Sequence, residues 1–184
     1  MKRKLFLKKR LERKKNRSVL SKSASARSDE YVHWMGEAMR LARRAFDRGE
    51  VPVGALVVRE GRVLGRGHNR RESTGDPTHH AEIEAIRKAS RRMRSWRLDG
   101  AVLYVTLEPC AMCAGACVNA RIAKVIYGCA DPKAGYVETL GRVTADPRLN
   151  HRCEIQGGVC EEETAEILRR FFRERRRKKH ARAK

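Results

Sequence analysis

The chain has 184 residues, of which 41% are hydrophobic, and a formal net charge of +21. This length fits one domain with tails, and the hydrophobic content is enough for a buried core, which excludes a wholly disordered chain. No run of about 18 consecutive apolar residues occurs, and the basic start MKRKLFLKKRLERKK lacks the apolar segment of a secretory signal. We therefore expect a cytoplasmic protein with no membrane association.

The positive charge is concentrated at the two ends of the chain. Residues 1–28 hold 12 Lys and Arg against one acid, a net charge of +11, and residues 166–184 hold 10 against two acids, a net charge of +8. The segment 29–165 has a net charge of only +2. Blocks of basic residues are typical of segments that bind nucleic acid, although a solvated tail without a specific partner fits the same composition.

The first part of the domain is expected to form a helix and a β-hairpin. Ser28 or Asp29 is placed to cap the helix, and Gly49 is placed to end it. Two strands, 53–58 and 63–64, follow around a tight glycine turn.

The rest of the domain is expected to alternate between helices and strands. A loop over 70–78 precedes a second helix, from about His79 to Met93. The later elements are a strand at 101–107, a helix at 111–120, strands at 124–128 and 153–159, and a helix from about Glu161 into the basic tail. This alternation predicts an α/β fold, a three-layer αβα sandwich around one mostly parallel five-stranded sheet.

Two short motifs place potential metal ligands at the starts of two predicted helices. These are His-Ala-Glu (80–82) and Pro-Cys-Ala-Met-Cys (109–113). Two thiolates separated by two residues at a helix N-terminus can bind one ion. With His80, Cys110 and Cys113, three of the four positions of a tetrahedral zinc are filled, and a catalytic zinc keeps the fourth open.

Glu82 lies on the same first helical turn as His80, where it can move protons at the open position without binding the metal. Zinc lowers the pKa of a bound water towards about 7. Such a site suits hydrolytic attack on an amidine-like carbon with release of ammonia. A closed structural site would need a fourth ligand, Cys117 or His79, and would leave Glu82 without a role.

The combined pattern H-x-E…P-C-x-x-C is the signature of the zinc nucleobase deaminases. From about Tyr31 to Arg177 the sequence resembles the bacterial tRNA adenosine deaminases. The blocks that carry the resemblance are VPVGALVV (51–58), GHNR (67–70), DPTHHAEI (76–83), LYVTLEPCAMCAGA (103–116), RI (121–122), DPKAG (131–135), LNHR (149–152) and RRFFRERR (169–176). The resemblance implies a cytidine-deaminase-like fold and hydrolytic conversion of adenosine to inosine at the wobble position, 34, of the tRNA anticodon.

The same resemblance implies roles for individual residues. His80, Cys110 and Cys113 would bind one Zn²⁺ per subunit, and Glu82 would be the catalytic proton shuttle. The implied substrate-binding residues are Asn69, Ala81, Asp131 and Lys133, and the candidates for RNA contact in the last helix are Phe172, Arg173, Arg175 and Arg176. A partnership with the tRNA anticodon arm and a homodimer are also implied.

Simpler interpretations exist for several of these residues. Asn69 fits a residue that satisfies the backbone of a turn. Phe171 and Phe172 fit packing at the end of an amphipathic helix, and the nearby arginines fit a solvated face. The remaining cysteines, which have no metal-like spacing, fit free thiols in a reducing compartment: Cys117, Cys129, Cys153 and Cys160.

The chain departs from the family pattern at two places. His79 stands where the family usually has a small residue, and its spacing to Glu82 makes His80 the favoured ligand. The stretch 134–143 differs from the usual small-residue pattern, notably at Glu138, which leaves the detail of that loop open.

Two other functions are weighed against tRNA deamination. One is a guanine, cytosine or nucleoside deaminase, but cytidine deaminases have Cys-Ala-Glu in place of His-Ala-Glu. Guanine deaminases usually have a proline where this chain has Ala111, and the basic ends have no use with a neutral small molecule. The other is a non-catalytic RNA-binding subunit, against which the complete set of ligands and Glu82 argue.

We accordingly divide the chain into a basic flexible arm (1–28), a zinc-dependent deaminase domain (29–177) and a basic C-terminal tail (178–184). The arm fits RNA contact, although its basic, Ser-containing composition also occurs in organelle-targeting peptides. Which tRNA is read is left open by the sequence.

Overall fold

The computed structural model describes residues 26–182 of the chain. Most of the predicted arm, 1–28, lies outside the described residues, and 26–28 are helical. The first helix occupies the described residues 26–47, so the prediction that Ser28 or Asp29 caps it is wrong. Its end is as predicted, because Gly49 takes a φ of 75° and its N–H donates to the Phe46 carbonyl at 2.9 Å. The sheet and the site both belong to the compact unit that begins at Trp34.

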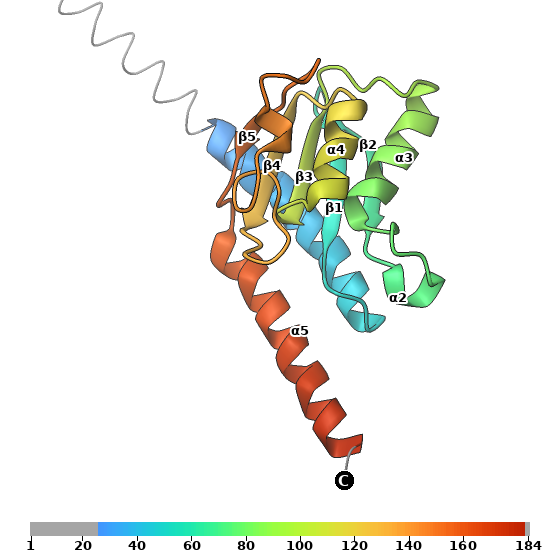
Figure 1. The fold of residues 1–184 in the computed structure, drawn as a ribbon, viewed down its shortest axis with the longest axis vertical. Coiled ribbons are helices and arrows are strands. Elements are labelled where there is room, and N and C mark those ends of the chain that lie inside the picture. The colour runs from blue at the N-terminus through green and yellow to red at the C-terminus, as the bar shows by residue number, and fades with distance from the viewer. Residues whose placement is uncertain (1–25, 183–184) are drawn as a thin grey trace, which may run out of the picture. The chain divides into compact units, whose positions relative to one another are not determined.

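The five predicted strands form one sheet, in the order β2-β1-β3-β4-β5 (Figure 1). They are β1 (Gly54–Arg59), β2 (Arg62–His68), β3 (Val102–Leu107), β4 (Lys124–Cys129) and β5 (Glu154–Gln156). β1 is antiparallel to β2 and to β3, whereas β3, β4 and β5 are mutually parallel. Four strands therefore point the same way and only β1 is reversed, which confirms the predicted mostly parallel sheet.

Helices cover both faces of the sheet and make three layers. α3 (Ala81–Met93) and α4 (Ala111–Asn119) pack on one face, and α5 (Glu161–Arg182) and the helix over 34–47 lie on the other (Figure 1). Alternate strand residues are directed to the two faces. Between α3, α4 and the sheet, for example, Val57, Leu103 and Val105 are fully buried.

Two short elements were not predicted. One is a 3₁₀ helix, η1 (Val143–Ala145), and the other is a turn of α-helix. α2 (Arg71–Thr74) is a single helical turn inside the range 70–78, which the composition marked as loop. Its N-terminal amides are satisfied by a distant side chain, because the buried Glu50 carboxylate accepts hydrogen bonds from the N–H groups of Glu72 at 3.0 Å and Ser73 at 2.7 Å. Local sequence carries no sign of a cap that comes from another element.

The described helices include none with the length and apolarity needed to span a membrane. Cys117, Cys129, Cys153 and Cys160 are free thiols, as the sequence predicted, and the first three of them are buried.

The close approach of β2 to α3 depends on glycine. A Cβ at Gly67 would overlap the Ala81 carbonyl oxygen and lie 2.8 Å from the Ala85 nitrogen. We predict that Gly67→Ala lowers the free energy of unfolding by about 1–3 kcal/mol, because backbone atoms of α3 must move to accept the methyl group. The measurement is urea denaturation, with Gly36→Ala as the control.

Gly36 lies in the first helix with nothing within 4 Å of its Cβ position. Its substitution should stabilise the protein by up to about 1 kcal/mol through helix propensity. Equal effects of the two substitutions would contradict the close packing of β2 on α3.

Candidate metal centre and active site

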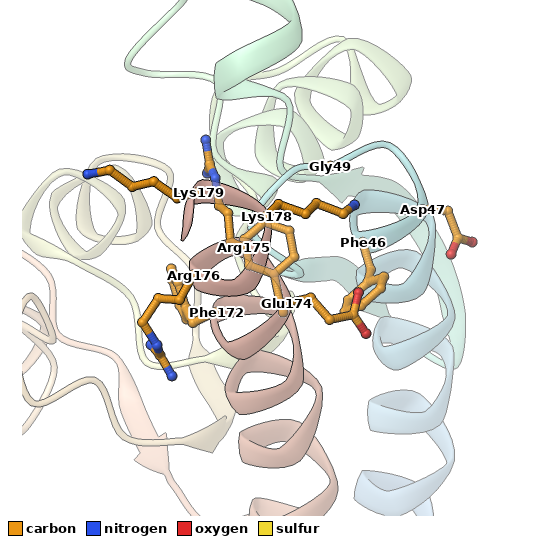
Figure 2. Close-up of a pocket in the computed structure, with 10 residues that line it drawn as sticks. Phe46, Asp47, Gly49, Phe172, Glu174, Arg175, Arg176, Lys178 and Lys179 are labelled. Carbon is orange, nitrogen blue, oxygen red and sulfur yellow. The ribbon is translucent and has the colours of Figure 1, made fainter. Parts of the chain in front are cut away.

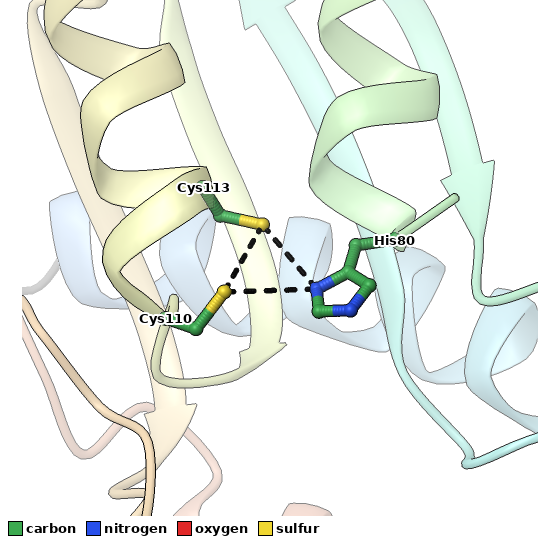
Figure 3. A group of neighbouring side chains, drawn as sticks. All are labelled: His80, Cys110 and Cys113. Carbon is green, nitrogen blue, oxygen red and sulfur yellow. Dashed lines mark hydrogen bonds between the residues drawn. The ribbon is translucent and has the colours of Figure 1, made fainter. Parts of the chain in front are cut away.

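Two helix N-termini meet beside the carboxyl end of β3. His80 is the N-cap residue of α3, and Cys110, which follows β3 by way of Glu108 and Pro109, is the N-cap residue of α4. Figure 3 shows that His80, Cys110 and Cys113 point toward one another from these two helix starts. The site therefore lies at the edge of the sheet where open α/β folds commonly place their ligands.

The three potential ligand atoms form a small triangle. The two sulfur atoms are 3.7 Å apart, and His80 Nδ1 is 3.7 Å from Cys110 Sγ and 3.5 Å from Cys113 Sγ. A tetrahedral zinc with Zn–S bonds of about 2.3 Å and a Zn–N bond of about 2.1 Å separates two sulfurs by about 3.8 Å and a sulfur from a nitrogen by about 3.6 Å. The triangle thus has the dimensions of one face of a zinc coordination tetrahedron, and its soft donors suit that ion.

Neither alternative fourth ligand belongs to this group. Among the residues that the structure describes, His80, Cys110 and Cys113 are the one set of three or more such side chains close enough to share an ion. Cys117 is fully buried in the hydrophobic core, where burial raises the pKa of its thiol. The arrangement is that of a three-ligand site with one position open.

The electrostatic environment favours thiolate at Cys110. Hydrogen bonding with Cys113, aided by His80, lowers the pKa of Cys110 to about 4. The contact with Cys110 in turn raises the pKa of His80, while hydrogen bonding to Cys110 and burial raise the pKa of Cys113. The positive ends of two helix dipoles favour the same negative charge.

A cavity of 190 Å³ opens at the group. Of the residues implied by the resemblance, it is lined by Asn69, His80, Ala81, Glu82, Cys110 and Asp131. Glu82 is 4% exposed, and burial raises the pKa of its carboxyl group, which favours the uptake of a proton by this group. The cavity is smaller than the roughly 300–1,000 Å³ of sites for drug-sized ligands, so it suits a single base.

A larger groove of 840 Å³ adjoins this cavity and shares Val51, Leu107 and Asp131 with it. Lys133, Phe172, Arg173 and Arg176 line the groove and not the cavity. Phe172 is 42% exposed there.

The remaining aromatic and basic residues of α5 lie elsewhere. Phe171 is buried against Phe46, with ring centroids 5.6 Å apart, which confirms the packing interpretation for that residue. Arg175 lies outside the groove and pairs with Glu72 on α2.

The pattern of the sequence missed several cavity residues. They are Val51, Val53, Arg71, Leu107, Glu108 and Ala134. The apolar residues have no feature that separates them from ordinary strand or loop residues, and Arg71 lies in a segment predicted to be a loop. Glu108 carried a usable signal, since a carboxylate between a buried strand and Pro109 needs donors for its oxygens.

Comparison with known proteins agrees with this geometry. A family model described as MafB19-like deaminase matches residues 29–176. The tRNA-specific adenosine deaminase of Bacillus subtilis (strain 168) is 47% identical over 148 residues, 80% of this chain and 92% of that protein. This chain belongs to the tRNA-specific adenosine deaminase family. The resemblance inferred from the sequence blocks is thereby confirmed.

Two solved structures are similar to this chain in both sequence and fold. One comes from studies of A-to-I editing by tRNA:A34 deaminases at the wobble position of transfer RNA; it is 48% identical, with a TM-score of 0.71, over 74% of this chain and 99% of that one. The other, a guanine deaminase from Bacillus subtilis, is 38% identical with a TM-score of 0.50, over 52% of this chain and 62% of that one. The fold match to the tRNA:A34 deaminase is thus the more extensive of the two.

Glu108 anchors the loop that forms one wall of the deaminase cavity. Its Oε1 accepts hydrogen bonds from the N–H groups of Val137, Glu138 and Thr139, and its Oε2 accepts from Asp131 N–H and the Thr139 hydroxyl. A Cβ at Gly135 would overlap this carboxylate. Since every partner is a donor, the loop requires the ionised acid.

Glu138, where the loop departs from the family pattern, is part of the same structure. Its N–H donates to Glu108 at 2.8 Å, and its carboxylate accepts a hydrogen bond from the Tyr127 hydroxyl at 2.6 Å. The departure therefore ties the loop to β4.

We predict that His80→Ala abolishes stoichiometric metal binding whereas His79→Ala retains it. His80 Nδ1 lies at ligand distance from both sulfurs, and His79 lies outside the group. Metal content after dialysis against dilute zinc, measured by mass spectrometry, checks this. Loss of metal in His79→Ala with retention in His80→Ala would reverse the assignment.

We predict that Glu108→Gln lowers the free energy of unfolding at pH 7 by about 3 kcal/mol, because an amide NH₂ would face donors it cannot accept from. Burial opposes ionisation of Glu108, but hydrogen bonds from Thr139, Glu138 and Asp131 outweigh it and hold the pKa below its ordinary value of 4.5. This contribution is present above that ordinary value and is lost as the pH falls through the lowered folded pKa.

Urea denaturation between pH 7 and pH 3.5 is the measurement. The difference between the wild type and Glu108→Gln should shrink below about pH 4.5. Glu154→Gln, which changes an exposed carboxylate paired with Lys124, should leave the midpoint little changed. A difference that is independent of pH would show that the Glu108 charge is not what holds the loop.

Proposed function

We propose that the protein hydrolyses adenosine to inosine at wobble position 34 of a tRNA anticodon, with release of ammonia. The observation that carries this is a three-donor metal group beside a buried glutamate, in a cavity of base size that opens on a groove lined by basic residues of α5. The relatives are named for the same reaction, as a tRNA-specific adenosine deaminase and a tRNA:A34 deaminase. The proposed metal is zinc, one ion per subunit, held by His80, Cys110 and Cys113.

The proposed substrate path begins at the groove. Lys133, Arg173 and Arg176 would meet RNA phosphates, and the exposed ring of Phe172 offers a surface for an unstacked base. Because the wobble adenosine lies in a single-stranded loop, extruding it costs about a few kcal/mol at most. The base then enters the cavity, where Asn69 and the backbone of Ala81 would orient it.

In the cavity, Glu82 is placed to handle every proton of the reaction. When bound, zinc supplies the acidification of a water molecule that makes hydroxide available near neutral pH. Glu82 accepts one proton of the attacking water and gives it to the ring nitrogen next to C6 of the base, and it then takes the second proton from the hydroxyl group now bound to C6. It gives this second proton to the amino group, which leaves as ammonia while the C6–N bond breaks and C6=O forms, so the carboxyl serves twice as base and twice as acid.

Asp131 has a second function in this proposal. Its Oδ1 accepts hydrogen bonds from the N–H groups of Lys133 at 2.9 Å and Ala134 at 3.2 Å, so the carboxylate shapes its own turn. The turn in turn presents Lys133 to the groove. We propose that Asp131 acts on RNA both directly and through this turn.

The other expectations from the sequence stay proposals. A homodimer is supported by exposed apolar side chains between β4 and β5, namely Tyr136, Leu140 and Leu149. The division into a basic arm (1–28), a deaminase domain (29–177) and a basic tail (178–184) is retained, with α5 continuing to Arg182. A cytoplasmic location follows from a tRNA substrate.

A guanine deaminase is the second candidate, favoured by the partial match to the Bacillus subtilis enzyme. Incubation with an anticodon stem-loop RNA that carries adenosine at position 34, and separately with free guanine, separates the two. We expect inosine in the RNA and no ammonia from guanine. The opposite pattern would sink the tRNA assignment.

We predict that Glu82→Ala retains zinc and loses inosine formation by about 10²–10⁴-fold, the usual contribution of a general acid–base group. Metal analysis and single-turnover assays on the stem-loop are the measurements. Glu84→Ala is the control, because Glu84 lies on the same helix but outside the cavity and pairs with Lys88 at 2.7 Å. Substantial turnover by Glu82→Ala would exclude the proposed mechanism.

A further inference from the structure

A carboxylate lies between two arginines, one of which lines the cavity. Glu72 Oε1 is 3.5 Å from Arg71 Nη2, and Glu72 Oε2 is 3.5 Å from Arg175 Nη2. Arg71 and Glu72 belong to α2 and Arg175 to α5, so the carboxylate connects two elements that are distant in the sequence. Each of its oxygens faces one guanidinium group.

Both ion pairs are loose. A separation of 3.5 Å is beyond the usual 2.7–3.2 Å of N–H···O hydrogen bonds. The side chains are also open to water, with exposed fractions of 49% for each arginine and 45% for Glu72. Exposed pairs of this kind contribute little, so a better-matched anion can replace the carboxylate at small cost.

Arg71 is the member that reaches the reaction site. It lines the 190 Å³ cavity together with Asn69, His80 and Glu82. Its position is not left to a flexible loop, because the buried Glu50 carboxylate binds the N–H groups of the next two residues. A cation is thus held at the cavity mouth, beyond the neutral base that the cavity would receive.

Arg175 does not line the groove, although its neighbour Arg176 lines both the groove and a hollow that Arg175 shares. The guanidinium carbon of Arg175 is 5.8 Å from the Phe171 ring centroid, and Arg175 lines this hollow of 710 Å³ with Phe46 and Gly49. Figure 2 shows its side chain extending away from α5, toward the segment that contains α2. Arg173 and Arg176 serve the groove, which leaves the pairing with Glu72 as the particular feature of Arg175.

We propose that Arg71 and Arg175 together bind one backbone phosphate of the RNA next to the target adenosine, and that the Glu72 carboxylate occupies this phosphate site in the free enzyme. A phosphodiester presents two non-bridging oxygens, as the carboxylate does, and arginine binds such a pair of oxygens well. The extruded base brings its own backbone to the cavity mouth, where Arg71 lies. This inference rests on the proposed function and specifies how the substrate backbone is held.

The proposal makes opposite predictions for the acid and the two bases. Glu72→Gln removes the competing charge and should tighten binding of the anticodon stem-loop about threefold or more. Arg71→Gln and Arg175→Gln should each weaken binding and make the slope of log affinity against log salt shallower, by up to about 0.7 for a lost single-strand phosphate contact. Fluorescence anisotropy with a labelled stem-loop, at several salt concentrations and with zinc content verified, provides both quantities.

Glu60→Gln is the matched control. Glu60 also pairs with an arginine, Arg59, at 3.5 Å, but it lies beyond the end of β1 that is remote from the cavity. It changes the net charge by the same amount, so an equal gain in affinity for Glu60→Gln and Glu72→Gln would overturn the proposal. Unchanged or weaker binding by Glu72→Gln would overturn it as well.

A modified RNA tests the phosphate itself. A neutral methylphosphonate placed in turn at each of the two phosphates that flank adenosine 34 should weaken binding to the wild type at one of them, and Arg71→Gln should be insensitive to that change. Equal sensitivity of the wild type and Arg71→Gln at both positions would refute a contact with Arg71. Inosine formation by the wild type on the unmodified RNA tests the proposed function separately, so either idea can fail alone.

Discussion

The site exists because two helix N-termini can approach one point at the end of β3. His80 belongs to the start of α3 and Cys110 to the start of α4, and the ligand triangle has sides of only 3.5–3.7 Å. That approach requires small residues where the helices lie on the sheet. At Gly67 the backbone of β2 contacts the backbone of α3 beside Ala81 itself, so the packing that stabilises the domain also places the ligands.

Two buried carboxylates fix the positions of the segments that form the cavity walls. Glu50 holds α2 on one side, and Glu108 holds the loop over 131–139 on the other. Both carboxylates accept hydrogen bonds from backbone N–H groups of a distant segment. Neither carboxylate is hydrogen-bonded to a metal ligand among the described residues. A wall built this way keeps its shape without covering the cavity with apolar side chains, which leaves polar groups free for a base.

The sequence predicted the features that depend on local patterns and missed those that depend on contacts between residues distant in the chain. The strands, α3, α4 and the ligand motifs depend on local periodicity and on spacing of a few residues, so they were predictable from the chain alone. α2 and the wall made by Glu108 depend on partners more than 20 residues away in the sequence, and no local pattern reports these. Arg71 was missed for the same reason, because its place at the cavity follows from the tertiary cap on α2.

The positions of the basic residues say more about RNA binding than the net charge of +21 does. The basic residues of α5 do not form one uniform face, since Arg173 and Arg176 line the groove while Arg175 turns to Glu72. A general attraction to RNA needs no such division, because any exposed cation serves it. Alignment of one nucleotide with the cavity does need this division of the arginines, because a phosphate bound between α2 and α5 sets the distance from the RNA backbone to the cavity. The long-range charge therefore brings RNA to the surface, and a paired cation at the rim aligns one nucleotide with Glu82.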